Sequence, residues 1–148
     1  MGNIRTRVES KLEVESYIQS LKYALKNNAA ISFQQDRQVD QGRDIRYTNR
    51  FTVADLFPDE NPIDALKREL QTLTPEEYIQ AVKDIRFPKK SEMREFGRVY
   101  RGTDDVYIKI RVELLADSGK HTTFIMSFHY AAVPFTEDTF PYKRKEAQ

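Results

Sequence analysis

Apolar and polar residues alternate strictly late in the chain, and this pattern limits the possible folds more than any other part of the sequence. In residues 105–115, DVYIKIRVELL, every second side chain from Val106 onward is aliphatic. Successive side chains of a β-strand point to opposite faces, so this pattern predicts a strand with one face in a core and the other polar. The runs EFGRVYR at 95–101 and HTTFIMSFHY at 121–130 have the same period. We therefore expect three strands in a C-terminal antiparallel sheet.

The turns between these runs decide which side chains face one another. A three-residue loop at 117–119 turns the apolar sets of the last two strands to the same face. With this register, Tyr107 lies opposite His129 on the polar face. The same register predicts four pairs on the core face: Val106 opposite Tyr130, Ile108 opposite Phe128, Ile110 opposite Met126 and Val112 opposite Phe124. It predicts two further pairs on the polar face: Lys109 opposite Ser127 and Arg111 opposite Ile125.

The register of the first of the three strands depends on the loop RGTDD, which allows either parity. If Val99 faces the core, Arg98 lies beside Lys109 on the polar face. If the parity is reversed, Gly97 and Arg101 face the polar side instead. We prefer the first register because it buries Val99.

Earlier in the chain the apolar spacing is helical. Residues 8–27 predict an amphipathic helix, and two extended runs within 30–48 predict a hairpin ribbon. Asn61, followed by proline, predicts the start of a short helix. Thr74, with a glutamate three residues later, forms a capping box and predicts a second helix that ends near Arg86.

These elements predict one α+β domain over residues 1–148, with an N-terminal helix, a ribbon, two short helices and a C-terminal antiparallel sheet. Residues 131–148 are expected to be a loosely attached tail. The chain has no cysteine, which excludes disulfides, thiolate metal sites and thiol nucleophiles. Because it has neither a long apolar run nor the pattern of a signal peptide, we expect a soluble cytoplasmic protein without a membrane partner.

The net charge of +1 hides an uneven distribution of charge. Residues 83–111 contain nine Lys and Arg against five Asp and Glu, whereas residues 51–82 contain two against seven. Uneven charge of this kind is common on solvated surfaces. The basic segment is nevertheless compatible with an anionic partner, because nucleic-acid binding depends on local charge.

Two interpretations fit the polar face of the predicted sheet. It is either an ordinary solvated face, or a site that cleaves phosphodiesters. RNA cleavage without metal needs a base, an acid and cations that hold the phosphate. His129 suits proton transfer near neutral pH, and Tyr107 can donate a proton or a hydrogen bond. Arg98, Lys109 and Arg111 are the candidate phosphate ligands. Arg98 is predicted to be catalytic together with Tyr107 and His129, and Lys109 and Arg111 are predicted to bind RNA. Neither a metal nor a cofactor is predicted, and His121 is expected at the surface.

The stretch LTPEEYIQAVKDIRFP, followed by EFGRVYRG, DVYIKIRVELL and FIMSFH, resembles the MqsR branch of the RelE-like messenger-RNA interferase toxins. The resemblance covers roughly residues 61–130. It implies a RelE-like α+β fold, metal-independent endoribonuclease activity on messenger RNA and a cognate antitoxin in a bacterial type II toxin–antitoxin system. The family's strand tyrosine falls on Tyr107, and a lysine in its last strand falls on His129.

The chain also departs from this family pattern. Gln80 stands where the family has a lysine, and Gly97 stands where it has a glutamine. Lys83, one turn further along the expected helix, or Arg98 can supply the missing groups, and Lys83 is therefore a candidate RNA-binding residue. An alternative is a non-catalytic module of the same fold that binds RNA or a protein partner, and a third is an unrelated α+β domain whose polar face is only solvated.

Overall fold

The structure, a computed structural model, describes residues 3–27, 30–35, 44–114 and 121–143. Its strands form one six-stranded sheet in the order β1-β3-β4-β5-β6-β2. All neighbouring strands are antiparallel except β2, which runs parallel to β6. The strands are β1 (Ile4–Arg7), β2 (Ala30–Phe33), β3 (Tyr78–Asp84), β4 (Met93–Tyr100), β5 (Asp104–Leu114) and β6 (His121–Tyr130).

The described residues also form three α-helices and two 3-10 turns: α1 (Lys11–Lys26), α2 (Asn49–Leu56), α3 (Pro62–Leu70), η1 (Ile45–Tyr47) and η2 (Pro75–Glu77). The α+β class expected from the sequence is confirmed. The expected order is only partly right, because strands occur along the whole chain and are not confined to its C-terminal half.

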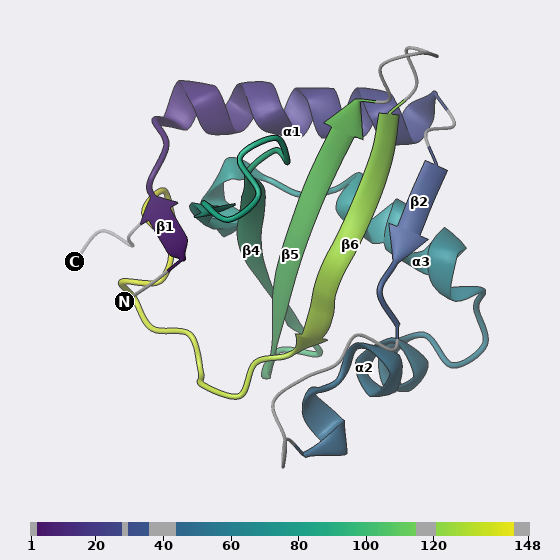
Figure 1. Ribbon diagram of the computed structural model, residues 1–148. Coiled ribbons are helices and arrows are strands. Elements are labelled where there is room, and N and C mark those ends of the chain that lie inside the picture. Colours follow the sequence, from purple (N-terminus) through teal and green to yellow (C-terminus); the bar gives the residue numbers. More distant parts are fainter. Residues whose placement is uncertain (1–2, 28–29, 36–43, 115–120, 144–148) are drawn as a thin grey trace.

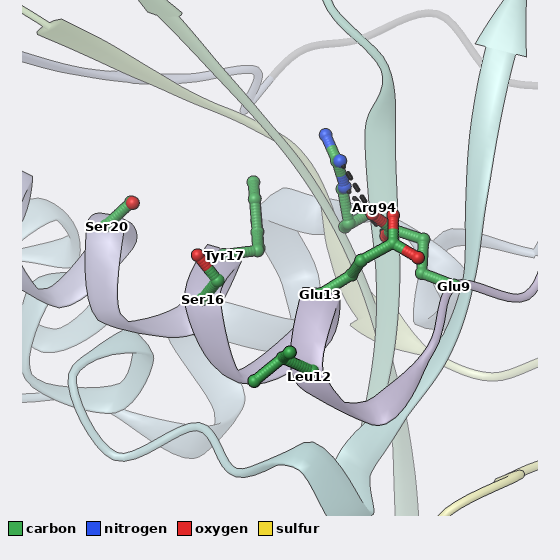
Figure 2. A pocket seen from close by; sticks show the side chains of 7 residues that line it. All are labelled: Glu9, Leu12, Glu13, Ser16, Tyr17, Ser20 and Arg94. Carbon is green, nitrogen blue, oxygen red and sulfur yellow. Dashed lines mark hydrogen bonds and ion pairs between the residues drawn. The ribbon is translucent and has the colours of Figure 1, made fainter.

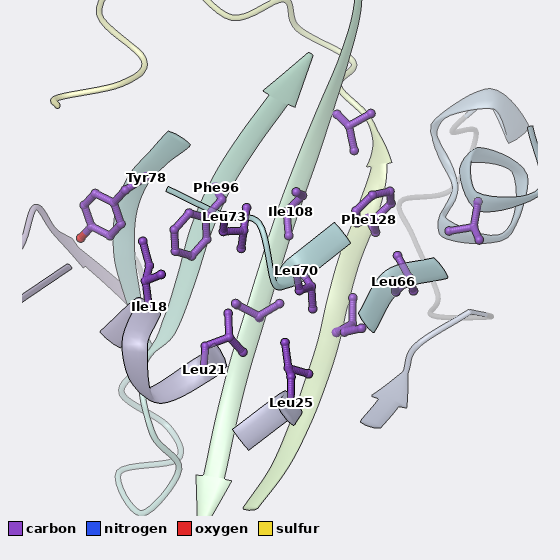
Figure 3. Packing of buried hydrophobic residues seen from close by; sticks show 14 of the residues in the cluster. Ile18, Leu21, Leu25, Leu66, Leu70, Leu73, Tyr78, Phe96, Ile108 and Phe128 are labelled. Atoms are coloured by element: carbon purple, nitrogen blue, oxygen red, sulfur yellow. The ribbon is translucent and has the colours of Figure 1, made fainter. Parts of the chain in front are cut away.

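The hydrophobic core lies between the helices and one face of the sheet, with α1 crossing behind β5 and β6 (Figure 1). Figure 3 shows side chains of α1 and α3 directed at the aromatic and aliphatic side chains of β4, β5 and β6. We call the opposite side of the sheet, which carries Glu95, Gly97, Tyr107, Lys109 and His129, the open face.

Helix α1 confirms the helix expected within 8–27. Ser10 caps it in a reciprocal capping box with Glu13, and Asn27 ends it. The residues of α1 that pack into the core recur at helical spacing and are Val14, Ile18, Leu21, Ala24 and Leu25.

The hairpin ribbon expected at 30–48 is not formed. Its first run is β2, which pairs with β6, and its second run contains the 3-10 turn η1. The Asp44 side chain accepts a hydrogen bond from the backbone N–H of Arg46, which favours a turn there. The turn expected near residues 40–42 lies outside the described residues. Helix α2, which the sequence did not predict, follows directly.

The helix predicted to begin at Asn61 is α3, and Asn61 accepts hydrogen bonds from two backbone N–H groups of its first turn. The prediction of a second helix from Thr74 to Arg86 is wrong. The capping box of Thr74 and Glu77 is present, but it starts only the 3-10 turn η2, and residues 78–84 form β3. Pairing with β1 on one side and β4 on the other stabilises the extended backbone more than the local cap stabilises a helix.

A buried ion pair ties the chain ahead of α1 to β4. Glu9 is 3 % exposed, and its carboxylate accepts hydrogen bonds of 2.9 and 3.1 Å from the Arg94 guanidinium. The Tyr78 hydroxyl also donates to Glu9, and the guanidinium carbon of Arg94 lies 4.4 Å from the centroid of the Tyr17 ring. Figure 2 shows Arg94 and Glu9 meeting at the start of α1.

Replacing Arg94 by methionine is expected to lower the free energy of unfolding by about 3 kcal/mol, because the Glu9 carboxylate stays buried without its main cation. Urea denaturation measures this loss. The matched control is Arg86→Met, which breaks an exposed pair with Asp84 and should cost below about 1 kcal/mol. Equal losses in the two variants would contradict this account of the Glu9 pair.

Candidate active site on the open face

The strands β5 and β6 place Tyr107 directly opposite His129, as predicted. Their ring centroids lie 5.4 Å apart, with an angle of 41° between the ring planes. The predicted pairing of Lys109 with Ser127 is also confirmed. The His129 Nδ1 atom lies 2.9 Å from the backbone oxygen of Tyr130. Because a carbonyl oxygen only accepts hydrogen bonds, this contact assigns a proton to Nδ1.

Beyond Lys109 the predicted register is wrong, because a β-bulge lies between Lys109 and Ile110. The bulge moves every later pair by one residue and so exchanges the two faces of β6. Ile125 is consequently buried opposite Ile110. The predicted pairs of Ile110 with Met126, Val112 with Phe124 and Arg111 with Ile125 do not form.

Arg111 lies opposite Phe124 as a result of this shift, and its guanidinium carbon is 4.9 Å from the centroid of that ring. Its Nε atom lies 3.1 Å from a carboxylate oxygen of Glu113. Arg111 therefore stays on the open face as predicted, but further along the strand than Tyr107 and stacked on an aromatic ring.

The preferred register of β4 is also wrong, and the reversed parity is observed. Gly97 lies opposite Tyr107, Arg98 lies opposite Val106, and Val99 is 49 % exposed. The reason is Phe96, which takes the core position opposite Ile108 and is fully buried.

Arg98, predicted as a catalytic residue, consequently lies on the side of the sheet away from Tyr107 and His129. Its guanidinium donates hydrogen bonds of 2.6 and 2.8 Å to the Glu77 carboxylate and a third of 2.7 Å to the Thr72 hydroxyl. Arg98 thus holds η2 against β4, and the structure does not bring it to the candidate site.

Glu95, which was not predicted from the sequence, lies at the centre of the site. Glu95 is 8 % exposed and lies opposite Lys109. Its carboxylate accepts a hydrogen bond from the Tyr107 hydroxyl and one of 2.7 Å from the Gln80 amide, and the Lys109 ammonium lies 3.9 Å away. Gln80 therefore contributes to the site through Glu95. The parity of the β4–β5 loop was the signal that could have identified Glu95.

Lys83, predicted to bind RNA, lies on β3. Its ammonium donates hydrogen bonds to the backbone oxygens of Pro88 and Lys90 and so closes the loop between β3 and β4. This position does not bring Lys83 into the cluster of Glu95, Tyr107 and His129.

The described part of the expected C-terminal tail, residues 131–143, lies against Gly97 on the open face. A Cβ atom built on Gly97 would lie 2.7 Å from the Phe135 ring and 2.9 Å from the Phe140 ring. The Phe135 backbone N–H also donates a 2.9 Å hydrogen bond to Asp105. Only glycine leaves room for this segment at that position.

Gly97→Ala is therefore expected to destabilise the protein by about 1–3 kcal/mol, because both rings must move off the sheet. Thermal unfolding measures the effect. In the double variant with Phe135→Ala the two losses should not add, since the second change removes the ring that the new methyl group meets. Full additivity would show that Phe135 does not pack on Gly97 in solution.

Among the described residues, no group of three or more His, Asp or Glu side chains is arranged to hold a metal ion. Within the same residues, no helix has both the length and the apolar character that crossing a membrane requires. Comparisons with protein-family models, with curated proteins and with solved structures gave no match for this chain.

Proposed function

We propose that the protein is an endoribonuclease that cleaves messenger RNA without a metal, using the open face around Tyr107 and His129. The observation that carries the proposal is the cluster of a tyrosine, a histidine, a buried carboxylate and a lysine on three adjacent strands. The Tyr107 hydroxyl donates a hydrogen bond to Glu95, His129 lies across from Tyr107, and Lys109 lies opposite Glu95.

These groups supply what cleavage through the ribose 2′-hydroxyl requires. The Tyr107 oxygen takes the proton of the 2′-hydroxyl while its own proton passes to Glu95, and the 2′-oxygen forms a bond to phosphorus. The bond from phosphorus to the 5′-oxygen breaks, and His129, protonated on both ring nitrogens, gives that oxygen the proton of Nε2. Lys109 offsets the negative charge that builds on the phosphate. The products are a 2′,3′-cyclic phosphate and a 5′-hydroxyl end.

The resemblance to the MqsR branch supports a more specific role, as the toxin of a type II toxin–antitoxin system with a cognate antitoxin as protein partner. Induction of the wild-type gene in a bacterial host should then arrest growth, and co-expression of a neighbouring antitoxin gene should restore it. The purified protein should cleave RNA in the presence of EDTA. A stably folded protein that neither arrests growth nor cleaves RNA would overturn the proposal.

One observation favours a second candidate, a non-catalytic module that binds RNA or a protein. The place of the family's glutamine is taken by Gly97, and the Phe135 ring fills the space above it. Such a module would bind single-stranded RNA or its partner with the same affinity before and after Tyr107→Phe. An endoribonuclease would lose cleavage in that variant, while Tyr23→Phe on the exposed side of α1 would leave cleavage unchanged.

A further inference from the structure

A small cavity lies on the open face beside the candidate active site. It measures about 180 Å³, and its lining includes Phe87, Lys90, Met93, Arg111 and Met126. Met93 and Arg111 lie two residues along β4 and β5 from Glu95 and Lys109, so their side chains project from the same face. The cavity therefore continues the surface that carries the catalytic cluster.

The lining combines apolar groups with cations. Phe87 is 47 % exposed, although it is a large hydrophobic side chain. The Lys90 ammonium lies 4.8 Å from the centroid of its ring, and the Arg86 guanidinium carbon lies 5.5 Å from it. Exposed aromatic rings close to cations are the groups with which proteins stack the bases of single-stranded nucleic acids and hold their phosphates.

The acidic side chains near the cavity are neutralised by arginines. Asp84, which also lines it, accepts hydrogen bonds of 2.7 and 3.0 Å from Arg86. These bonds lower the pKa of Asp84 to about 2. Glu113 is paired with Arg111 at 3.1 Å. The carboxylates in this region are thus matched by guanidinium groups, which reduces their repulsion of a phosphate.

The size of the cavity suits one flat ring system. A volume of about 180 Å³ is several times the roughly 30 Å³ share of one water in the liquid. It is smaller than the roughly 300–1,000 Å³ of pockets that enclose drug-sized ligands. The thioethers of Met93 and Met126 offer polarisable apolar contacts for a ring.

We propose that this cavity binds one unpaired nucleobase of the RNA substrate, stacked on Phe87, next to the phosphate that is cleaved. The proposal rests on the proposed function and extends it, since it assigns single-stranded RNA as the substrate class. Stacking on a ring is tolerant of base identity, so the cavity selects unpaired bases over paired ones.

The chain contains no tryptophan, so a single introduced indole reports on this cavity alone. The test uses Phe87→Trp in a His129→Ala background, in which cleavage is slow enough for a titration. Addition of a single-stranded RNA oligonucleotide should quench the indole fluorescence, and an abasic oligonucleotide of equal length should quench it far less. The matched control, Tyr23→Trp, places the indole at an exposed position of α1, and its fluorescence should not be quenched.

The second arm measures affinity directly. Phe87→Ala in the same background should bind the oligonucleotide about 5- to 150-fold more weakly, the effect of losing one stacked base, and Phe87→Tyr should restore binding. No quenching at position 87 and unchanged affinity would overturn the nucleobase site even if the wild type cleaves RNA. Equal quenching by the abasic oligonucleotide would overturn it too. Base-dependent quenching without cleavage by the wild type would support the site and refute the endoribonuclease.

Discussion

Replacing His129 by alanine is expected to slow RNA cleavage by about 100- to 10,000-fold, because the leaving 5′-oxygen then loses its proton donor. The fold should be retained, since the His129 side chain is only half-buried and packs beside the Tyr107 ring on the open face. Single-turnover cleavage of a labelled RNA measures the rate of the chemical step. Affinity for the RNA should change little.

The matched control is His121→Ala, which removes the other of the two histidines in the chain. It should leave the cleavage rate unchanged. Equal rates for His129→Ala and the wild type, with both proteins folded, would remove His129 from the mechanism. A loss that tracks the unfolding temperature would assign His129 a structural role instead.

Glu95→Gln is expected to slow cleavage by about 100-fold or more, because an amide cannot accept the proton that Tyr107 passes on. The shape of the side chain is retained, and one of the two oxygens that accept hydrogen bonds from the Gln80 amide and the Tyr107 hydroxyl remains. Circular dichroism and the unfolding temperature check that the fold survives. The loss should appear in the rate of the chemical step and not in RNA affinity.

A suitable control is Glu76→Gln, because Glu76 is exposed and lies on η2. Its cleavage rate should match that of the wild type. If Glu95→Gln also keeps the wild-type rate, Tyr107 does not work through this carboxylate. Combining Glu95→Gln with Tyr107→Phe should cost no more than the larger single effect, since the two groups act as one unit.

The parts of the fold that could be predicted are those with a long, regular pattern. Helix α1 has its apolar spacing and its cap in the same stretch, and β4, β5 and β6 alternate over seven or more residues. The stretch after Thr74 was misassigned because a real capping box precedes it. Its strand conformation depends on β1 and β4, which are distant in sequence, and β1 itself has only four residues, Ile4–Arg7. Patterns of that length carry little information.

Only one part of the candidate site could be predicted from the sequence, for a related reason. The pairing of Tyr107 with His129 follows from parity, and parity holds until the bulge after Lys109. Glu95 and Arg98 exchange faces of the sheet when the loop before β5 takes the other parity, so that Glu95 and not Arg98 lies beside Lys109. In the structure, Arg101 and Gly102 of that loop have φ angles of 52° and 80°. The left-handed backbone conformation of Arg101 could not be predicted from the sequence, because arginine shows no strong preference for that conformation.

The cleavage chemistry is tested by comparing two substrates in the presence of EDTA. One is a single-stranded RNA that the wild type cleaves, and the other carries a single 2′-deoxy substitution at the cleaved position. We expect the first to be cut to a 2′,3′-cyclic phosphate and a 5′-hydroxyl end, and the second to stay intact. Equal cleavage of both substrates, or no cleavage of either by folded protein, would contradict it.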